Sequence, residues 1–206
     1  MITIVDYGMG NLGSVQNMFR RIGVAAQITS DLDEINNAEK ILLPGVGAFD
    51  AAMKRINEGG FRDVLDKKAM QDKVPVLGIC LGMQLLTNGS EEGTERGFGW
   101  IDAETKKFDF GLVSDLKIPH MGWNTLIRKN ASPLTDSLAE DAKFYFVHSY
   151  YVQTKAESNV LMVAHYGKDF DAVISNGTNI FGAQFHPEKS HKFGMNLFLN
   201  FAAIKI

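Results

Sequence analysis

The first ninety residues alternate short apolar runs with segments whose apolar residues recur at helical spacing. The apolar runs predict buried strands, which are expected at 2–5, 25–28, 40–43 and 74–79. The segments between them predict amphipathic helices, which are expected over 11–22, from 30 or 31 onward, over 49–57 and over 61–70. Strands that alternate with helices in this way predict an α/β fold, an open and mostly parallel sheet flanked by helices.

Polar residues stand where the predicted helices begin. Asn11, and then either Ser30 or Asp31, are suited to cap helices in the first half of the chain, and Ser190 is suited to cap a last helix. Gly23 is placed to end the first helix.

The residues from about 98 to 185 change character and predict a strand-rich second half. Clear strand patterns lie at 143–148 and 161–164, and Asn176-Gly177 between two apolar runs predicts a hairpin, because both residues tolerate positive φ. With no repeat, linker or low-complexity segment, we expect this half to extend the same sheet. Residues 1–206 are therefore predicted to be a single domain.

Composition limits the classes of partner. The 206 residues are 45% hydrophobic, carry a formal net charge of −3 and lack a run of like charge, so neither nucleic acid nor a membrane surface is expected to attract the chain. We find no signal-peptide pattern and no apolar stretch long enough to span a membrane, and we expect a cytoplasmic protein. The single cysteine excludes an internal disulfide and makes a structural metal site improbable.

That cysteine stands in a distinctive place. Gly78-Ile79-Cys80-Leu81-Gly82 follows an apolar run and precedes apolar residues at helical spacing, so Cys80 is predicted to sit at a sharp turn from strand to helix. Glycines on both sides would let the backbone bend there, and the first helical amides would favour a thiolate. A lone cysteine is more often an inert core residue, and the predicted elbow shifts the balance towards a nucleophile.

A second string near the end of the chain supplies the remaining chemistry. In His186-Pro187-Glu188, proline restricts His186 to extended geometry, so His186 and Glu188 can present their side chains from the same side of a turn. Glu188 could then hold one imidazole nitrogen while the other faces a nucleophile. His186 alone could equally be a core histidine. Together with Cys80 the set predicts acyl transfer through a thioester.

An oxyanion site requires two converging backbone amides. The amide of Leu81, directly after the nucleophile, is one candidate. The second is the amide of Gly47 in Pro44-Gly45-Val46-Gly47, at the end of a predicted neighbouring strand. The same glycines could simply form a tight turn.

These residues resemble the class I, triad-type glutamine amidotransferases, whose pattern is a Gly-x-Cys-x-Gly elbow and a late His-Pro-Glu. The resemblance runs the length of the chain. Within the family it is most similar to the glutaminase subunits of imidazole glycerol phosphate synthase, on the strings at 6–11, 44–49, 78–84, 119–124, 147–150 and 184–190. It implies a flavodoxin-like fold and no cofactor.

The resemblance implies that glutamine is hydrolysed to glutamate and ammonia, with Cys80 as nucleophile, His186 as acid and base, and Glu188 as its orienting group. Ammonia would pass to a (β/α)8-barrel cyclase, which forms an imidazole ring in histidine biosynthesis. Substrate recognition would involve Gln84, Glu92, Ser149 and Tyr150, with Glu92 suited to the α-ammonium of glutamine. Without the resemblance, Glu92 would be interpreted as solvated surface charge.

The resemblance also implies a partner interface. The positions that would face the barrel are Asn11, Met121, Trp123, Tyr145 and Lys189. Trp123 could instead pack in the core. His120 and His148 lie in the matched strings, and no role is assigned to His165 or His191.

Three other functions remain open at the level of sequence. A class I glutaminase could feed a different synthase, such as one for surface sugars, with the same triad. A stand-alone cysteine hydrolase of peptides or γ-glutamyl conjugates would need no partner. A flavodoxin-like interaction domain would carry Cys80 only as a structural residue.

Overall fold

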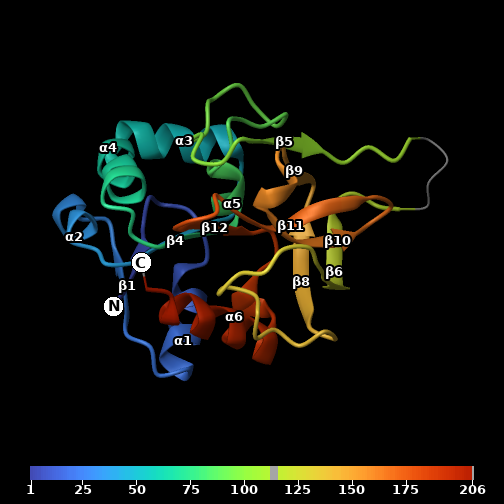
Figure 1. The fold of residues 1–206 in the computed structure, drawn as a ribbon. Helices are drawn as coiled ribbons and strands as arrows, with labels where there is room; N and C mark the ends of the chain where they lie inside the picture. The colour runs from blue at the N-terminus through green and yellow to red at the C-terminus, as the bar shows by residue number, and fades with distance from the viewer. Residues whose placement is uncertain (112–115, 206) are drawn as a thin grey trace.

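The computed structural model describes residues 1–111 and 116–205, and it has a central sheet between two layers of helices (Figure 1). The first half contributes four parallel strands, β1 (Ile2–Val5), β2 (Ala26–Thr29), β3 (Ile41–Gly45) and β4 (Val76–Cys80). Their order in the sheet is β2-β1-β3-β4. This confirms the α/β prediction for the first half of the chain.

Alternate residues of these strands enter two separate cores. Ile4, Leu42 and Leu77 pack in the core below the sheet in Figure 1, with α1 (Leu12–Arg21) and α6 (His191–Ala203). Val5 and Leu43 pack in the core on the opposite face. The helices of that face are α2 (Leu32–Asn36), α3 (Phe49–Glu58), α4 (Phe61–Asp66), which continues as a π-helix (Lys67–Gln71), and α5 (Leu81–Leu85). Burial on both faces explains why β1, β3 and β4 are largely apolar along their whole length, whereas the edge strand β2 is only partly buried.

The second half is rich in strands, as predicted. Its strands are β5 (Ala103–Lys107), β6 (His120–Thr125), β7 (Ile127–Arg128), β8 (Lys143–His148), β9 (Tyr150–Thr154), β10 (Val160–His165), β11 (Asp169–Ser175) and β12 (Ile180–Ala183). Single-turn 3-10 helices lie at Glu157–Asn159 and Pro187–Lys189. β12 runs parallel to β4, and β11, β10 and β7 extend the sheet antiparallel from it.

One part of this prediction is wrong, because β6 and β8 do not join the large sheet. They pair with each other as a two-stranded antiparallel sheet, in register from His120↔His148 to Thr125↔Lys143. The hairpin expected at Asn176-Gly177 is confirmed between β11 and β12. The Asn176 side-chain oxygen accepts hydrogen bonds from the backbone amides of Thr178, Asn179 and Ile180, which closes the turn.

The predicted caps have different outcomes. Asp31 caps α2, because its carboxylate accepts from the amides of Asp33 and Glu34. Asn11 and Ser190 precede α1 and α6, but neither side chain makes a capping hydrogen bond, so those two predictions are wrong.

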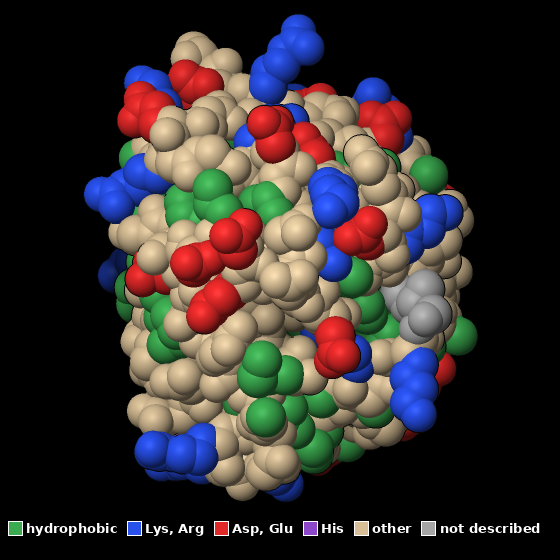
Figure 2. All heavy atoms as spheres, turned by 90° about the vertical axis from the view of Figure 1, so that its left-hand side faces the viewer, with side chains coloured by type: hydrophobic (Ala, Val, Ile, Leu, Met, Phe, Trp, Pro, Cys, Tyr) green, Lys and Arg blue, Asp and Glu red, His purple; other side chains and the backbone are tan. Residues whose placement is uncertain are grey.

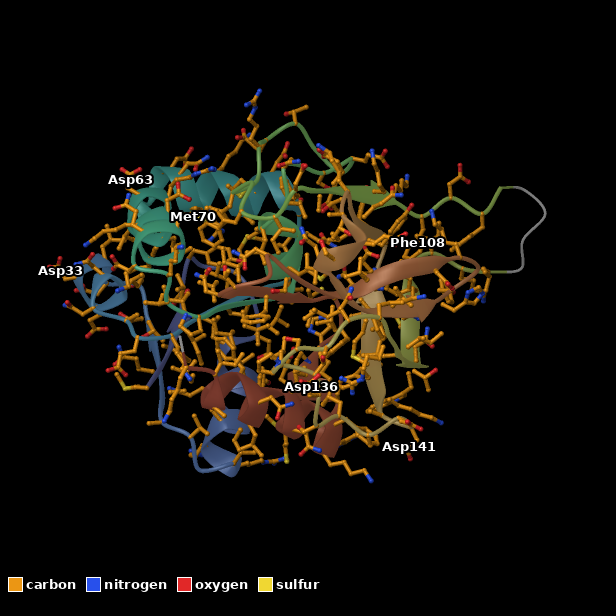
Figure 3. The ribbon with its side chains drawn as sticks, viewed as in Figure 1. Asp33, Asp63, Met70, Phe108, Asp136 and Asp141 are labelled. Carbon is orange, nitrogen blue, oxygen red and sulfur yellow. The ribbon has the colours of Figure 1, made fainter. Side chains whose placement is uncertain are left out.

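Charged side chains are dispersed over the outer surface that carries α2 and α4. Acidic and basic groups alternate there with small apolar patches (Figure 2). Asp33 of α2 and Asp63 of α4 lie at the periphery, whereas Phe108 lies inward among the strands (Figure 3). No helix in the described ranges combines the length and apolar character that crossing a membrane requires.

The close packing of α6 on the 187–189 turn gives the first testable prediction. A Cβ on Gly194 would lie 1.8 Å from the Pro187 carbonyl oxygen, whereas one on Gly13 of α1 would meet nothing within 4 Å. We expect Gly194→Ala to lower the free energy of unfolding by about 1–3 kcal/mol, since backbone must move. Gly13→Ala, the matched helical control, should raise it by about 0.5–1 kcal/mol. Urea unfolding followed by circular dichroism measures both, and equal effects would contradict the packing argument.

Candidate active site

Three segments that are distant in sequence meet at one edge of the sheet. β4 lies between β3 and β12, with Gly45 paired to Cys80 and Ala183 paired to Ile79. Because the three strands are parallel, the residues that follow their carboxyl ends emerge together. These residues are the glycine-rich loop after β3, Cys80 at the end of β4, and the segment from Gln184 to Glu188 after β12.

Cys80 has a strained backbone at the predicted elbow. Its φ of 54° and ψ of −110° lie outside the usual regions for a residue with a side chain, and such strain persists only where the surroundings enforce it. Gly78 and Gly82 do not themselves form the bend. They are needed because neighbouring backbone lies too close to leave room for a Cβ. A Cβ on Gly82 would lie 1.9 Å from the Leu43 oxygen, and one on Gly78 would lie 2.5 Å from the Gly82 oxygen. The start of α5 therefore sits directly on β3 and β4.

His186 and Glu188 form the predicted pair. The His186 Nδ1 and the Glu188 Oε1 are 2.8 Å apart, and each side chain is only 3% exposed. The turn between them is held by the Lys189 amide, which donates to the His186 oxygen. Ser190 takes part here instead of capping α6, because its hydroxyl donates to the same oxygen and accepts from the Tyr145 amide. Its hydroxyl is therefore not available to the helix.

The charge state of His186 follows from its neighbours. Burial disfavours an imidazolium, but hydrogen bonds with Cys80 and Glu188, together with the charges of both groups, outweigh it and raise the pKa of His186 from 6.5 to about 10. In the described part of the chain, Oε2 of Glu188 is the one buried side-chain oxygen or nitrogen without a hydrogen-bond partner. A buried carboxylate with one oxygen left without a hydrogen bond is stabilised by a neighbouring positive charge, and the cation beside Glu188 is protonated His186.

The glycine-rich loop lies against the N-terminal segment. Gly47 has a φ of +129°, which favours glycine, and a Cβ there would lie 2.4 Å from the Met9 side chain. The start of the loop is fixed by Tyr7, whose hydroxyl donates to the Pro44 oxygen at 2.6 Å. Burial, and then the nearby Cys80, raise the pKa of Tyr7, so this hydroxyl stays protonated. Sequence reasoning assigned Tyr7 no role.

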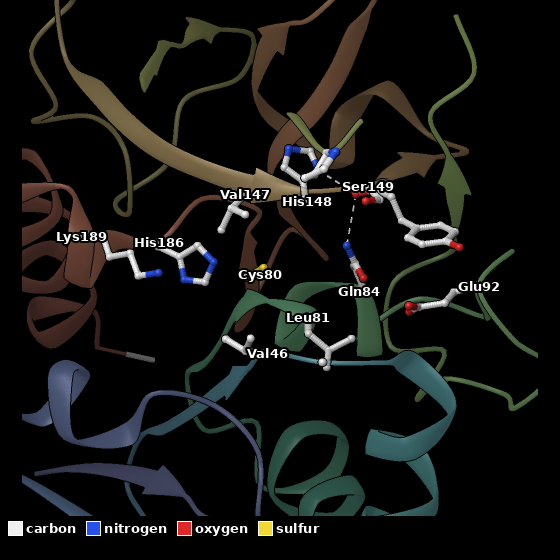
Figure 4. Close-up of a pocket in the computed structure, with 13 residues that line it drawn as sticks. Val46, Cys80, Leu81, Gln84, Glu92, Val147, His148, Ser149, His186 and Lys189 are labelled. Atoms are coloured by element: carbon white, nitrogen blue, oxygen red, sulfur yellow. Dashed lines mark hydrogen bonds between the residues drawn. The ribbon is translucent and has the colours of Figure 1, made fainter. Parts of the chain in front are cut away.

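A cavity of about 290 Å³ opens beside Cys80 and brings most of the predicted residues together. Its lining includes all four predicted substrate residues, both oxyanion candidates, the predicted nucleophile and His186, namely Gly47, Cys80, Leu81, Gln84, Glu92, Ser149, Tyr150 and His186. Figure 4 shows His186 and Gln84 on opposite sides of Cys80, with Lys189 beyond the first and Glu92 beyond the second. The volume is at the small end of the range for small-molecule sites.

The polar groups of this cavity are already oriented. Glu92 is exposed, and its Oε2 accepts from the Phe49 amide at the start of α3 at 2.9 Å, so the carboxylate is held at the rim. Gln84 is buried and donates to the Tyr150 and Gln184 oxygens, both at 3.2 Å. Gln184 in turn donates to the Cys80 sulfur at 3.8 Å. Gln184 was missed at the level of sequence, although a glutamine inside the apolar run before His186 is unusual enough to indicate a role.

Of the residues predicted to face a partner, Lys189 lines the cavity and several others are exposed. Met121 is 62% exposed and Trp123 is 48% exposed, so the core alternative for Trp123 is wrong. Trp123 packs edge-on against Tyr145 and stacks on His191, and the Lys189 Nζ lies 5.6 Å from the centre of the Tyr145 ring. Asn11 is also exposed, at the start of α1. No group of three or more potential metal ligands occurs within residues 1–111 and 116–205.

The fold and the site define a class of protein. The sequence profile of the family described as glutamine amidotransferase class-I matches residues 3–205, and the chain belongs to this family. It is 53% identical over 201 residues to the protein named imidazole glycerol phosphate synthase subunit HisH 2 of Methanococcus maripaludis, with 98% of each chain covered. It is 47% identical over 204 residues to the protein of the same name of Pseudomonas aeruginosa, with 99% and 100% covered. The family expected from the sequence is thereby confirmed.

Solved structures share the fold at low sequence identity. A crystal structure of a glutamine amidotransferase has a TM-score of 0.74 at 18% identity, covering 98% of this chain and 99% of its own. The structure of PurLQS from Thermotoga maritima has a TM-score of 0.69 at 20% identity, covering 97% of this chain and 96% of its own. Both support the predicted fold class.

The His186 environment gives a prediction about charge. We expect Glu188→Gln to lower the pKa of His186, because the amide keeps the size of the side chain and removes its charge. In the wild type, charged His186 adds to the free energy of unfolding because its pKa is higher in the folded state than in the unfolded state. This contribution is complete below about pH 6.5 and is lost as the pH rises through about 10. NMR titration of the His186 ring measures the shift directly. Urea unfolding should show a smaller loss between these pH values in the variant, and an unchanged pKa would contradict the assignment.

Proposed function

We propose that this chain is the glutaminase subunit of an imidazole glycerol phosphate synthase, hydrolysing L-glutamine and supplying ammonia to a cyclase. The observation that carries the proposal is the meeting of Cys80 with the buried His186–Glu188 pair beside a cavity lined by Gln84 and Glu92. Three relatives bearing the name of this synthase subunit cover 98–99% of the chain at 45–53% identity, which supports the same function. Residues 1–206 would act as one glutamine amidotransferase domain in the cytoplasm.

The chemistry proceeds in two steps. The Cys80 sulfur, as thiolate, attacks the side-chain amide carbon of glutamine, and the carbonyl electron pair moves to oxygen. When the intermediate collapses, the C–N bond breaks and His186 gives its proton to the departing nitrogen, which leaves as ammonia. Neutral His186 then takes a proton from a water molecule while the water oxygen attacks the thioester carbon. The C–S bond breaks to give glutamate and free Cys80. Glu188 orients the ring throughout.

The other residues act on charge and position. The amides of Gly47 and Leu81, two residues that line the cavity, would stabilise the oxyanion. Glu92 would receive the α-ammonium of glutamine. Gln84 and the backbone at Ser149 and Tyr150 would hold the rest of the substrate within the cavity.

The partner would be a (β/α)8-barrel cyclase that docks on the face carrying the exposed Met121 and Trp123. Asn11, Tyr145 and Lys189 would complete this interface. Lys189 lines the cavity as well, so docking would occur directly at the mouth of the active site. Aromatic residues and methionine are enriched at the centres of interfaces.

Removal of the sulfur separates the two activities of the complex. Cys80→Ala and Cys80→Ser should abolish glutamine-dependent synthesis and leave ammonia-dependent synthesis by the partner intact, because only the thioester step needs sulfur. Both rates are measured on the purified complex. Near wild-type glutaminase turnover in Cys80→Ala would contradict the thioester mechanism.

Docking should control turnover through the glycine-rich loop. The peptide between Val46 and Gly47 is the proposed switch, because Val46 is 52% exposed and the flanking Gly45 and Gly47 lower the steric barrier to rotating it. A rotated peptide would withdraw the Gly47 amide, and the loss of one donor costs about 10²–10³ in rate. We expect the free subunit to be nearly inactive, and Lys189→Ala to weaken stimulation by a ligand-loaded partner.

The control for this prediction is Lys192→Ala, an exposed lysine on α6 outside the cavity, which should be stimulated normally. Glutaminase turnover is compared between the complex and the free subunit, with and without acceptor ligand. A free subunit that already turns over at the rate of the loaded complex contradicts the gating and leaves the triad assignment intact.

The same assay distinguishes the other functions. Stimulation by a different synthase, and not by the imidazole-forming cyclase, would assign the subunit to another pathway. Partner-free hydrolysis of peptides or γ-glutamyl conjugates would indicate a stand-alone hydrolase.

A further inference from the structure

Two buried histidines face each other at the wall of the glutamine cavity, which His148 lines. His120 of β6 and His148 of β8 are opposite residues in the two-stranded sheet and are 3% and 6% exposed. The His120 Nδ1 and the His148 Nε2 are 3.0 Å apart. Neither ring is needed for the chemistry proposed above, so their contact calls for a separate explanation.

The hydrogen bonds at one end of the pair fix its tautomers. The His148 Nδ1 lies 2.7 Å from the Tyr150 carbonyl oxygen, which can only accept, so Nδ1 of His148 carries the proton. In a neutral ring Nε2 is then an acceptor. The His120 Nδ1 must therefore be the donor between the two rings, and the His120 Nε2 is left as an acceptor.

Asn124 meets that requirement at the other end. The Asn124 side-chain oxygen accepts from the Thr125 amide at 2.9 Å, and its nitrogen donates to the His165 carbonyl at 2.8 Å. The nitrogen of the amide is thus the atom that faces the His120 Nε2, at 3.4 Å. All three hydrogen bonds run in one direction, from Asn124 through His120 and His148 to the Tyr150 carbonyl.

The surroundings keep both rings neutral. His120 stacks on Tyr166 and Phe146, and His148 lies against Phe108 and Phe170. Burial lowers the pKa of His120 to about 4. Burial, opposed by the hydrogen bond to Tyr150 and assisted by the charges of His120 and His186, lowers the pKa of His148 to about 3. The titratable groups that face the pair are these two rings, His186 and Tyr166.

The end of the chain of hydrogen bonds is part of the cavity wall. The Tyr150 carbonyl oxygen accepts one hydrogen bond from His148 and another from the side-chain amide of Gln84, and Figure 4 draws both bonds. The Gln84 side chain also donates to the Gln184 side-chain oxygen, and the Gln184 nitrogen donates to the Cys80 sulfur. A displaced Tyr150 carbonyl would therefore move Gln84 and the wall at Ser149 and Tyr150.

We propose that His120 and His148 are positioning residues that, as fixed Nδ1–H tautomers, hold the Tyr150 carbonyl and so preorganise the glutamine cavity. The inference rests on the proposed function for its substrate and on geometry for the tautomers. Neither ring takes part in the proposed chemistry, although His148 lines the cavity. The pair acts on how well glutamine binds, through the carbonyl and Gln84.

The tautomers are tested first, on the uniformly ¹⁵N-labelled wild-type chain. Long-range ¹H–¹⁵N NMR spectra should show both rings protonated at Nδ1 and unprotonated at Nε2. Both should stay neutral between about pH 8 and about pH 5.5, where an ordinary histidine titrates. Assignment comes from single His120→Asn and His148→Asn variants. An Nε2–H tautomer in either ring, or titration of either ring in this window, overturns the proposal whatever the chain catalyses.

The second test separates positioning from mere packing by kinetics of the complex. His148→Leu removes the donor to Tyr150, whereas His148→Asn retains an N–H near the Nδ1 position. We expect His148→Leu to raise the KM for glutamine about 3- to 10-fold, the equivalent of one hydrogen bond, with a smaller change in kcat. His148→Asn should restore most of the loss. His165→Leu, at an exposed histidine of β10, is the control and should match the wild type.

The outcomes distinguish this inference from the proposed function. Wild-type complex without glutaminase activity contradicts the proposed function, and the NMR result still decides the tautomers. Equal KM values in wild type, His148→Asn and His148→Leu overturn the positioning role. Equal increases in both variants also overturn it, because the donor would then not matter. If circular dichroism shows that His148→Leu is unfolded, the NMR measurement and the His148→Asn comparison with wild type decide the question.

Discussion

The parallel hydrogen bonding of β4 to β3 and β12 is the constraint on which the site depends. It sets Gly45 beside Cys80 and Ala183 beside Ile79, and this register determines which residues emerge at the carboxyl edge of the sheet. A shift by one residue would turn buried side chains of β4 to the opposite face and carry Cys80 away from the segment that holds His186. Two cores, one on each face, make such a shift costly.

The strain at Cys80 is enforced by this packing. A backbone conformation of this kind costs about 1–3 kcal/mol. It persists because Gly82 packs directly against the Leu43 carbonyl, which holds the start of α5 against β3. The polar groups around the elbow are buried and joined by hydrogen bonds, so their positions are also determined before a ligand arrives. Among the buried side-chain nitrogen and oxygen atoms of the described residues, only Oε2 of Glu188 lacks a hydrogen-bond partner. The site is therefore built on a closely packed scaffold, and Val46, which lines the cavity, is 52% exposed.

The sequence was sufficient for features that depend on local pattern. The buried runs predicted the parallel strands, and glycines around Cys80 predicted the elbow, although the strained φ belongs to Cys80 and not to the glycines. Features that depend on distant partners were not predictable. The separation of β6 and β8 from the main sheet is set by pairing between remote segments, and the Ser190 hydroxyl binds the His186 carbonyl instead of capping α6. Tyr7 and Gln184 gain their importance only when folding places them beside Pro44 and Cys80.

The central claim is that Cys80 carries the glutamyl group during turnover, and mass spectrometry tests it most directly. The complex is mixed with glutamine, quenched in acid during the steady state and digested. The account predicts a glutamyl adduct on the peptide that contains Cys80, which disappears when glutamine is exhausted. Release of ammonia without any adduct on Cys80, or with the adduct on another residue, would contradict it.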